Sequence, residues 1–184
     1  MAILAFQKPD QILMLEADNF YGKFEFKPLE PGYGITVGNA LRRVLLSSLE
    51  GYAISSVRID GVKHEFDTIP GVKEDVTEIV LNLKGLIAKL QADSAKKIYI
   101  EAEGPCVLTA KAIKADFEVE ILNPDMYIAT LDEGAKLNME MTLEKGRGYV
   151  PAEQNVTNEI GVIATDSIYT PVVKANFTVD NARV

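Results

Sequence analysis

The residues best suited to chemistry are His64 and Cys106, because the sequence holds one histidine and one cysteine. A nucleophilic serine or cysteine needs a neighbouring base, and His64 is the sole imidazole available. A metal site needs several converging ligands, whereas His64 has only Glu65 and Asp67 near it in sequence, which favours a hydrogen-bonded or surface histidine. Cys106 can form no internal disulfide and is most simply a small apolar filler. We therefore expect no catalytic residue, no metal ligand and no cofactor.

Two pairs of carboxylates are spaced two residues apart, Glu101 with Glu103 and Glu118 with Glu120. General acid–base catalysis would need one member of a pair to have a raised pKa in a cleft. Both pairs alternate with apolar residues, which is typical of the solvent-facing side of a sheet. The pattern favours solvated sheet surfaces over an active site.

The run Lys-Gly-Arg-Gly-Tyr at residues 145–149 places two cations beside glycine amides, a combination that can bind an anion. It can also form a loop with glycines at positive φ, which its composition favours. A small RNA- or nucleotide-binding module that uses Lys145 to Tyr149 is the alternative function. The glycines of residues 32–38 have the wrong spacing for a dinucleotide loop and predict a tight turn into the following helix.

The 184 residues include 47% apolar and 25% charged residues, which are ordinary values for a globular domain. The 19 basic and 27 acidic residues give a net charge of −8, whereas proteins that bind duplex DNA usually carry a basic surplus. No apolar run approaches the roughly 18 residues of a membrane helix, and Lys8 and Asp10 interrupt the apolar start too early for a signal peptide. We expect a cytoplasmic protein that binds neither nucleic acid nor membrane directly.

A long helix is predicted over residues 35–50, with Gly51 as its C-cap. At 100° per residue, the side expected to face the core holds Val37, Ala40, Leu41, Val44, Leu45 and Ser48. The opposite side carries Arg42, Arg43 and Leu46, and arginines beside apolar residues are enriched in protein interfaces. The helix has either a second face for a protein partner or scattered exposed leucines of a monomer.

A second helix is predicted over residues 72–84, with Leu81 and Lys84 off its apolar stripe. Short alternating segments predict strands at residues 11–17, 23–28, 54–59, 62–66, 98–103, 117–121, 126–131, 137–143 and from 173 to the C-terminus. Long helices in a strand-rich chain indicate an α+β fold.

Several blocks, in this order, resemble the signature of the N-terminal domain of the bacterial RNA polymerase α subunit, with details similar to the Bacteroidetes branch. The blocks are LEPGYGITVGNALRRVLLSS (29–48), IDGVKHEF (59–66), GVKEDV (71–76), LNLKGL (81–86), KGRGYVPA (145–152) and IYTPV (168–172). Together they extend over essentially the whole chain.

The resemblance implies a non-catalytic assembly scaffold of DNA-directed RNA polymerase. In this family the domain forms a homodimer, which recruits the β subunit and then β′, and the catalytic magnesium site belongs to β′. The implied fold has two subdomains. A discontinuous dimerisation module comprises residues 1–51 and 168–184, with a long helix on a sheet, and a strand-rich insert comprises residues 52–167.

The resemblance also assigns contact residues. The β contact carries over to Arg43 and Leu46, and the segment from His64 to Asp75 is similar to a region that also faces β. The β′ contact carries over to Lys84, and the helical wheel adds Leu81. The dimer interface is expected at Val37, Leu41 and Leu45.

The family continues beyond the position of Val184 with a strand and a long helix that packs on the first helix. A linker and a DNA-binding domain follow in the family. Without that helix, we expect apolar surface on the first helix to be exposed and homodimer formation to be compromised.

Overall fold

The structure, a computed structural model, describes residues 6–155 and 159–181. The chain divides into two compact units, the terminal unit (Met1–Leu45 with Lys174–Val184) and the central unit (Leu46–Val173). The boundaries lie six residues from those expected for the two subdomains, at 45 rather than 51 and at 174 rather than 168. That the units are the dimerisation module and the insert stays a prediction.

The terminal unit begins with an antiparallel hairpin of β1 (Gln11–Ala17) and β2 (Gly22–Lys27). Its turn is held by Asp18, whose carboxylate accepts the backbone N–H groups of Phe20 at 2.6 Å and Tyr21 at 2.7 Å. An aspartate that bonds the backbone just after itself is a common way to stabilise a turn. The predicted hairpin is therefore present.

Helix α1 (Tyr33–Ser47) begins two residues before the predicted start at 35 and ends three residues before the predicted end at 50. Gly32 precedes it at φ 86°, so the turn into the helix uses a glycine, as expected. Gly51 is not the C-cap. It lies in strand β3, where a Cβ would be 1.7 Å from the backbone oxygen of Tyr169. Close backbone packing, not helix termination, explains this glycine.

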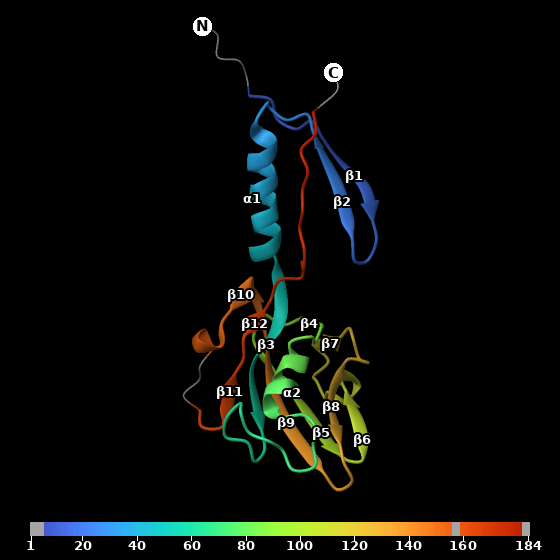
Figure 1. Ribbon diagram of the computed structural model, residues 1–184, viewed down its shortest axis with the longest axis vertical. Helices are drawn as coiled ribbons and strands as arrows, with labels where there is room; N and C mark the ends of the chain where they lie inside the picture. Colours follow the sequence, from blue (N-terminus) through green and yellow to red (C-terminus); the bar gives the residue numbers. More distant parts are fainter. Residues whose placement is uncertain (1–5, 156–158, 182–184) are drawn as a thin grey trace. The chain divides into compact units, whose positions relative to one another are not determined.

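The segment 174–181 runs along α1 (Figure 1). Cβ atoms built on Gly34 and Gly38 would lie 2.6 Å from Val179 and 2.3 Å from Phe177, so these helical glycines make room for the segment. The sequence predicted a strand from residue 173 onward, and this is wrong for residues 173–181, which form no strand. The middle of a helix has no unpaired N–H or C=O groups with which a neighbouring strand could form a ladder.

The central unit is built on a four-stranded antiparallel sheet in the order β11-β3-β9-β5. Its strands are β3 (Glu50–Ile59), β5 (Lys96–Glu103), β9 (Lys136–Arg147) and β11 (Val162–Ala164). Side chains alternate between the two faces, and the buried ones form the core, among them Val57, Ile98, Ile100, Met141 and Leu143. The alternation in the sequence therefore predicted the core face of this sheet.

Helix α2 (Val76–Leu83) buries Val76, Ile79 and Leu83 in that core. The predicted start at residue 72 is four residues too early, because Asp75 caps the helix by accepting the N–H of Glu78 at 2.7 Å. Val72 instead forms an isolated bridge with Leu131.

Shorter strands complete the unit as three pairs. They are β4 (Ala88–Leu90) with β7 (Val119–Ile121), β6 (Cys106–Thr109) with β8 (Tyr127–Leu131), and β10 (Tyr149–Val150) with β12 (Ser167–Ile168). Single-turn helices η1 (Ala110–Ala112) and η2 (Ala152–Gln154) lie between strands. The mixture of helices and small sheets confirms the α+β fold class.

Residues 62–66 were predicted as a strand and form an irregular turn. The carboxylate of Asp67 accepts the N–H of Lys63 at 3.2 Å, and the N–H of Asp67 donates to the carbonyl of His64 at 3.2 Å. These local bonds use backbone groups that a ladder would need, so the alternation of Val62 and His64 does not produce a strand.

Candidate functional site

Helix α1 carries the residues expected to bind other subunits, and none of its residues is buried in the described chain. Arg43 is exposed and Leu46 is half-buried, three positions along the same helix. On the side expected to face the core, Val37 is half-buried, while Leu41 is 36% and Leu45 is 40% exposed. The expectation of a buried core face is wrong for the described residues, and the expected apolar exposure on this side is present.

The segment from His64 to Asp75 leads into α2. His64 is exposed, and its carbonyl accepts the N–H of Asp67. Asp75 is also exposed, but its carboxylate serves as the N-cap of α2. The structure therefore gives Asp75 a folding role that is independent of any partner.

Glu74 fixes this segment to strand β8, and the sequence interpretation missed it. Its side chain is buried, at 8% exposure, and its two carboxylate oxygens accept the N–H of Thr130 at 2.7 Å and the hydroxyl of Tyr127. Burial on its own would raise the pKa of Glu74, but the hydrogen bonds from Tyr127 and Thr130 outweigh it and hold that pKa below its ordinary value. The hydrogen bond between Tyr127 and Glu74 also raises the pKa of Tyr127.

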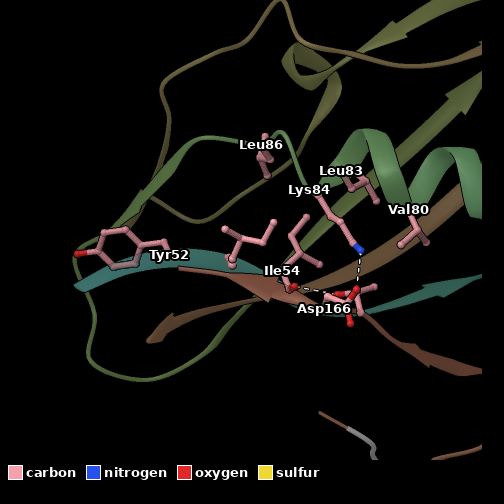
Figure 2. Close-up of a pocket in the computed structure, with 10 residues that line it drawn as sticks. Tyr52, Ile54, Val80, Leu83, Lys84, Leu86 and Asp166 are labelled. Atoms are coloured by element: carbon pink, nitrogen blue, oxygen red, sulfur yellow. Dashed lines mark hydrogen bonds and ion pairs between the residues drawn. The ribbon is translucent and has the colours of Figure 1, made fainter. Parts of the chain in front are cut away.

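At the C-terminal end of α2, Lys84 forms an ion pair with Asp166 (Figure 2). The ammonium Nζ lies 2.8 Å from Oδ2 of Asp166, and the side chains are 24% and 33% exposed. The hydrogen bond from Lys84 is the main cause that lowers the pKa of Asp166, and the hydrogen bond from the backbone N–H of Ala152 lowers it further. Leu81, three positions before Lys84, is 57% exposed. Both predicted β′-contact residues therefore lie at the surface of the central unit.

The ion pair closes one side of a small pocket whose other walls are mostly apolar (Figure 2). The lining includes Tyr52, Ile54, Val80, Leu83 and Leu86. Leu83 is a core residue, so the pocket lies directly over the core, beside the end of α2.

Residues 145–147 continue a strand and do not form the loop that their composition favoured, whereas Gly148 has φ 66°, as a turn at a glycine predicts. Lys145 and Arg147 lie in β9, and their cations pair with the carboxylate of Glu50 at 3.1 Å and 2.7 Å. Two hydrogen bonds lower the pKa of Glu50, and the one from Arg147 has a larger effect than the one from Lys145. Gly146 lies under the buried ring of Tyr169, whose Cε2 would be 2.6 Å from a Cβ there. The alternative function, an anion-binding module, is not favoured, because Glu50 already engages both cations.

The other candidate residues are in ordinary surroundings. Glu101 pairs with Lys114 at 2.6 Å and Glu103 with Lys136 at 3.6 Å, all with exposed side chains, as a solvated sheet surface predicts. Cys106 is a half-buried free cysteine in β6. Within residues 6–155 and 159–181, no group of three or more His, Cys, Asp or Glu side chains could hold a metal ion. The helices in those ranges are too short or too polar to cross a membrane.

Comparison with known proteins identifies the family. Residues 57–170 match the family model described as the RNA polymerase Rpb3/RpoA insert domain. The chain is 56% identical over 187 residues to a protein of Alkaliphilus oremlandii, with 100% of the chain and 59% of the relative covered. It is 57% identical over 184 residues to one of Carboxydothermus hydrogenoformans, with 99% and 58% covered. It is 54% identical over 189 residues to one of Bacteroides thetaiotaomicron, with 100% and 57% covered.

All three relatives are named DNA-directed RNA polymerase subunit alpha, and they include a member of the Bacteroidetes. The chain spans slightly less than three fifths of the length of these relatives. The chain belongs to the RNA polymerase Rpb3/RpoA insert domain family, and over its whole length it is similar to bacterial RNA polymerase α subunits.

Proposed function

We propose that this chain is a non-catalytic assembly scaffold of DNA-directed RNA polymerase, which dimerises and recruits β and then β′. The observation that carries the proposal is the similarity of the whole chain to proteins named as α subunits of that enzyme. The chain itself supplies no catalytic residue and no cofactor, acts in the cytoplasm as part of the nucleoid-associated enzyme, and binds neither nucleic acid nor membrane directly. Its net charge of −8 supports the absence of direct DNA binding.

The β subunit binds the side of α1 that carries Arg43 and Leu46. An arginine beside a leucine suits an interface, because the guanidinium forms charge-assisted hydrogen bonds and the leucine contributes apolar contact. The exposure of Arg43 and the partial exposure of Leu46 support this assignment. His64 and Asp75, both exposed in the central unit, are further β contacts.

The β′ subunit binds at the end of α2, through Lys84 and Leu81. The 57% exposure of Leu81 supports its role, because Val76, Ile79 and Leu83 already make the core contacts of this helix. Homodimerisation uses the apolar side of α1 at Val37, Leu41 and Leu45, and the partial exposure of these three residues supports it. The terminal unit is then the dimerisation module and the central unit the insert.

Ordered recruitment tests the proposal. The tagged chain is co-expressed with β alone, with β′ alone, and with both, and the captured proteins are identified. The proposal predicts that β is captured by itself and that β′ is captured when β is present. Capture of neither subunit, together with salt-sensitive binding of single-stranded RNA that weakens in Arg147→Ala, would favour the alternative module.

A further inference from the structure

The ammonium of Lys84 is held in place by a carboxylate that is itself fixed. Lys84 follows α2 directly as its C-cap residue, and its Nζ lies 2.8 Å from Oδ2 of Asp166. The second oxygen of Asp166, Oδ1, accepts the backbone N–H of Ala152 at 2.9 Å. One carboxylate therefore connects the end of α2 to the first residue of η2, 68 positions further along the chain (152 − 84).

The backbone on either side of Asp166 is anchored more firmly than Lys84 is. The buried hydroxyls of Thr165 and Ser167 both donate to the carbonyl of Ile54 in β3, at 2.8 Å and 3.1 Å. The N–H of Thr165 donates to the carbonyl of Ser55 at 2.9 Å. In contrast to this anchored backbone, the ammonium of a lysine lies at the end of a flexible chain of four methylene groups. Asp166 therefore sets the position of the Lys84 ammonium, and not the reverse.

We propose that Asp166 is a positioning residue for β′ recognition, which holds the Lys84 ammonium in one orientation at the end of α2. This inference rests on the proposed role of Lys84 in binding β′. An ammonium has three N–H donors, and Asp166 occupies one of them, so two remain for a hydrogen-bond acceptor on β′. Without Asp166 the lysine would have to be ordered when β′ binds, and that cost would weaken the complex.

The test compares variants in the tagged chain bound to β, with the affinity for β′ as the readout. Asp166→Asn keeps an oxygen that can accept the Ala152 N–H but removes the anion that pairs with Lys84. We expect β′ to bind about tenfold more weakly, which corresponds to the upper end of the cost of ordering one long side chain on binding. Lys84→Ala should cause a similar or larger loss, and the double variant should be no weaker than Lys84→Ala, because coupled residues are not additive.

Three controls separate positioning from folding. Glu153→Gln removes an exposed carboxylate on η2 and should leave β′ binding unchanged. Asp166→Glu should restore part of the lost affinity, because it restores the anion. Capture of β by Asp166→Asn should match the unaltered chain, and its thermal unfolding midpoint should fall only slightly, because the lowered pKa of Asp166 means that the anion contributes to stability. If capture of β falls together with β′ binding, Asp166 is merely structural and the inference is overturned.

The outcomes also distinguish this inference from the proposed function. If Lys84→Ala weakens β′ binding and Asp166→Asn does not, Asp166 is not a positioning residue, although the β′ surface is supported. If Lys84→Ala itself binds β′ normally, the proposed β′ surface is wrong, and the inference fails with it.

Discussion

The ring of Phe177 lies where a side chain on Gly38 would have to be, with its Cδ2 only 2.3 Å from the position of a Cβ. The ring and the glycine are far apart in sequence, yet both belong to the terminal unit. The contact explains why α1 has glycines at positions where helix propensity alone would favour alanine.

Gly38→Ala should loosen segment 174–181 from α1. Alanine gains about 1 kcal/mol in helix propensity, but overpacking against the ring costs about 1–3 kcal/mol. Proteolytic cleavage within residues 174–181 should be faster in Gly38→Ala and unchanged in the adjacent exposed variant Asn39→Ala. Combined with Phe177→Ala, the Gly38→Ala change should cost nothing further. Unchanged cleavage in Gly38→Ala would contradict the packing.

Glu74→Gln should lower the free energy of unfolding at pH 7 by about 1–3 kcal/mol, because Tyr127 and Thr130 donate to different carboxylate oxygens and the amide replaces one of these oxygens with an NH2 group. The pKa of Glu74 is lower in the folded chain than in the unfolded one, so its stabilisation is complete above the unfolded pKa. It is lost as the pH falls from about 4 through the folded pKa. Denaturant unfolding between pH 3 and 7 should show a shallower loss in Glu74→Gln. Glu78→Gln, at an exposed position, is the control and should behave like the unaltered chain. If the free energy of unfolding falls equally with pH in Glu74→Gln and in the unaltered chain, Glu74 does not have this role.

Leu83→Ala and Leu81→Ala form a matched pair on α2. Leu83 is 2% exposed in the core, so its truncation should cost about 2–5 kcal/mol of unfolding free energy. Leu81 is exposed, and its truncation should change stability by less than about 0.5 kcal/mol. Leu81→Ala should nevertheless weaken capture of β′. Normal β′ capture by a stable Leu81→Ala variant would remove Leu81 from the proposed surface.

Thr165→Val should destabilise the central unit by about 1–3 kcal/mol, because the buried carbonyl of Ile54 loses a donor. Ser167→Ala should act in the same direction, since it removes the second donor to the same carbonyl. Chemical denaturation measures both effects. Wild-type stability in both variants would mean that the backbone on either side of Asp166 is not anchored by these hydroxyls.

Features with a local periodic signal could be predicted from the sequence. Ile98 and Ile100 alternate with Tyr99, and Met141 and Leu143 alternate with Thr142. This pattern identified the core side of β5 and β9, because side chains two residues apart in a strand lie on the same face. The exposed position of Leu81 followed in the same way from the helical period.

Features that depend on distant contacts could not be predicted. Nothing near Glu74 in the sequence indicates that its partners are Tyr127 and Thr130, and nothing near Lys84 points to Asp166. The composition around Gly146 is typical of a loop, but Gly146 lies in β9, where the ring of Tyr169 packs over it. Local composition does not indicate which distant residues will be in contact, because those contacts depend on the order of the strands.

The most direct test of the scaffold role is capture of β by the tagged chain and by its Arg43→Ala/Leu46→Asp variant, with Glu153→Gln, at an exposed position outside the proposed β surface, as a control. Circular dichroism of each purified chain first establishes that the helix content is retained. The proposal predicts that the unaltered chain and the control capture β, whereas the double variant does not. Full capture by a folded double variant would contradict the assignment of the β-binding surface to α1.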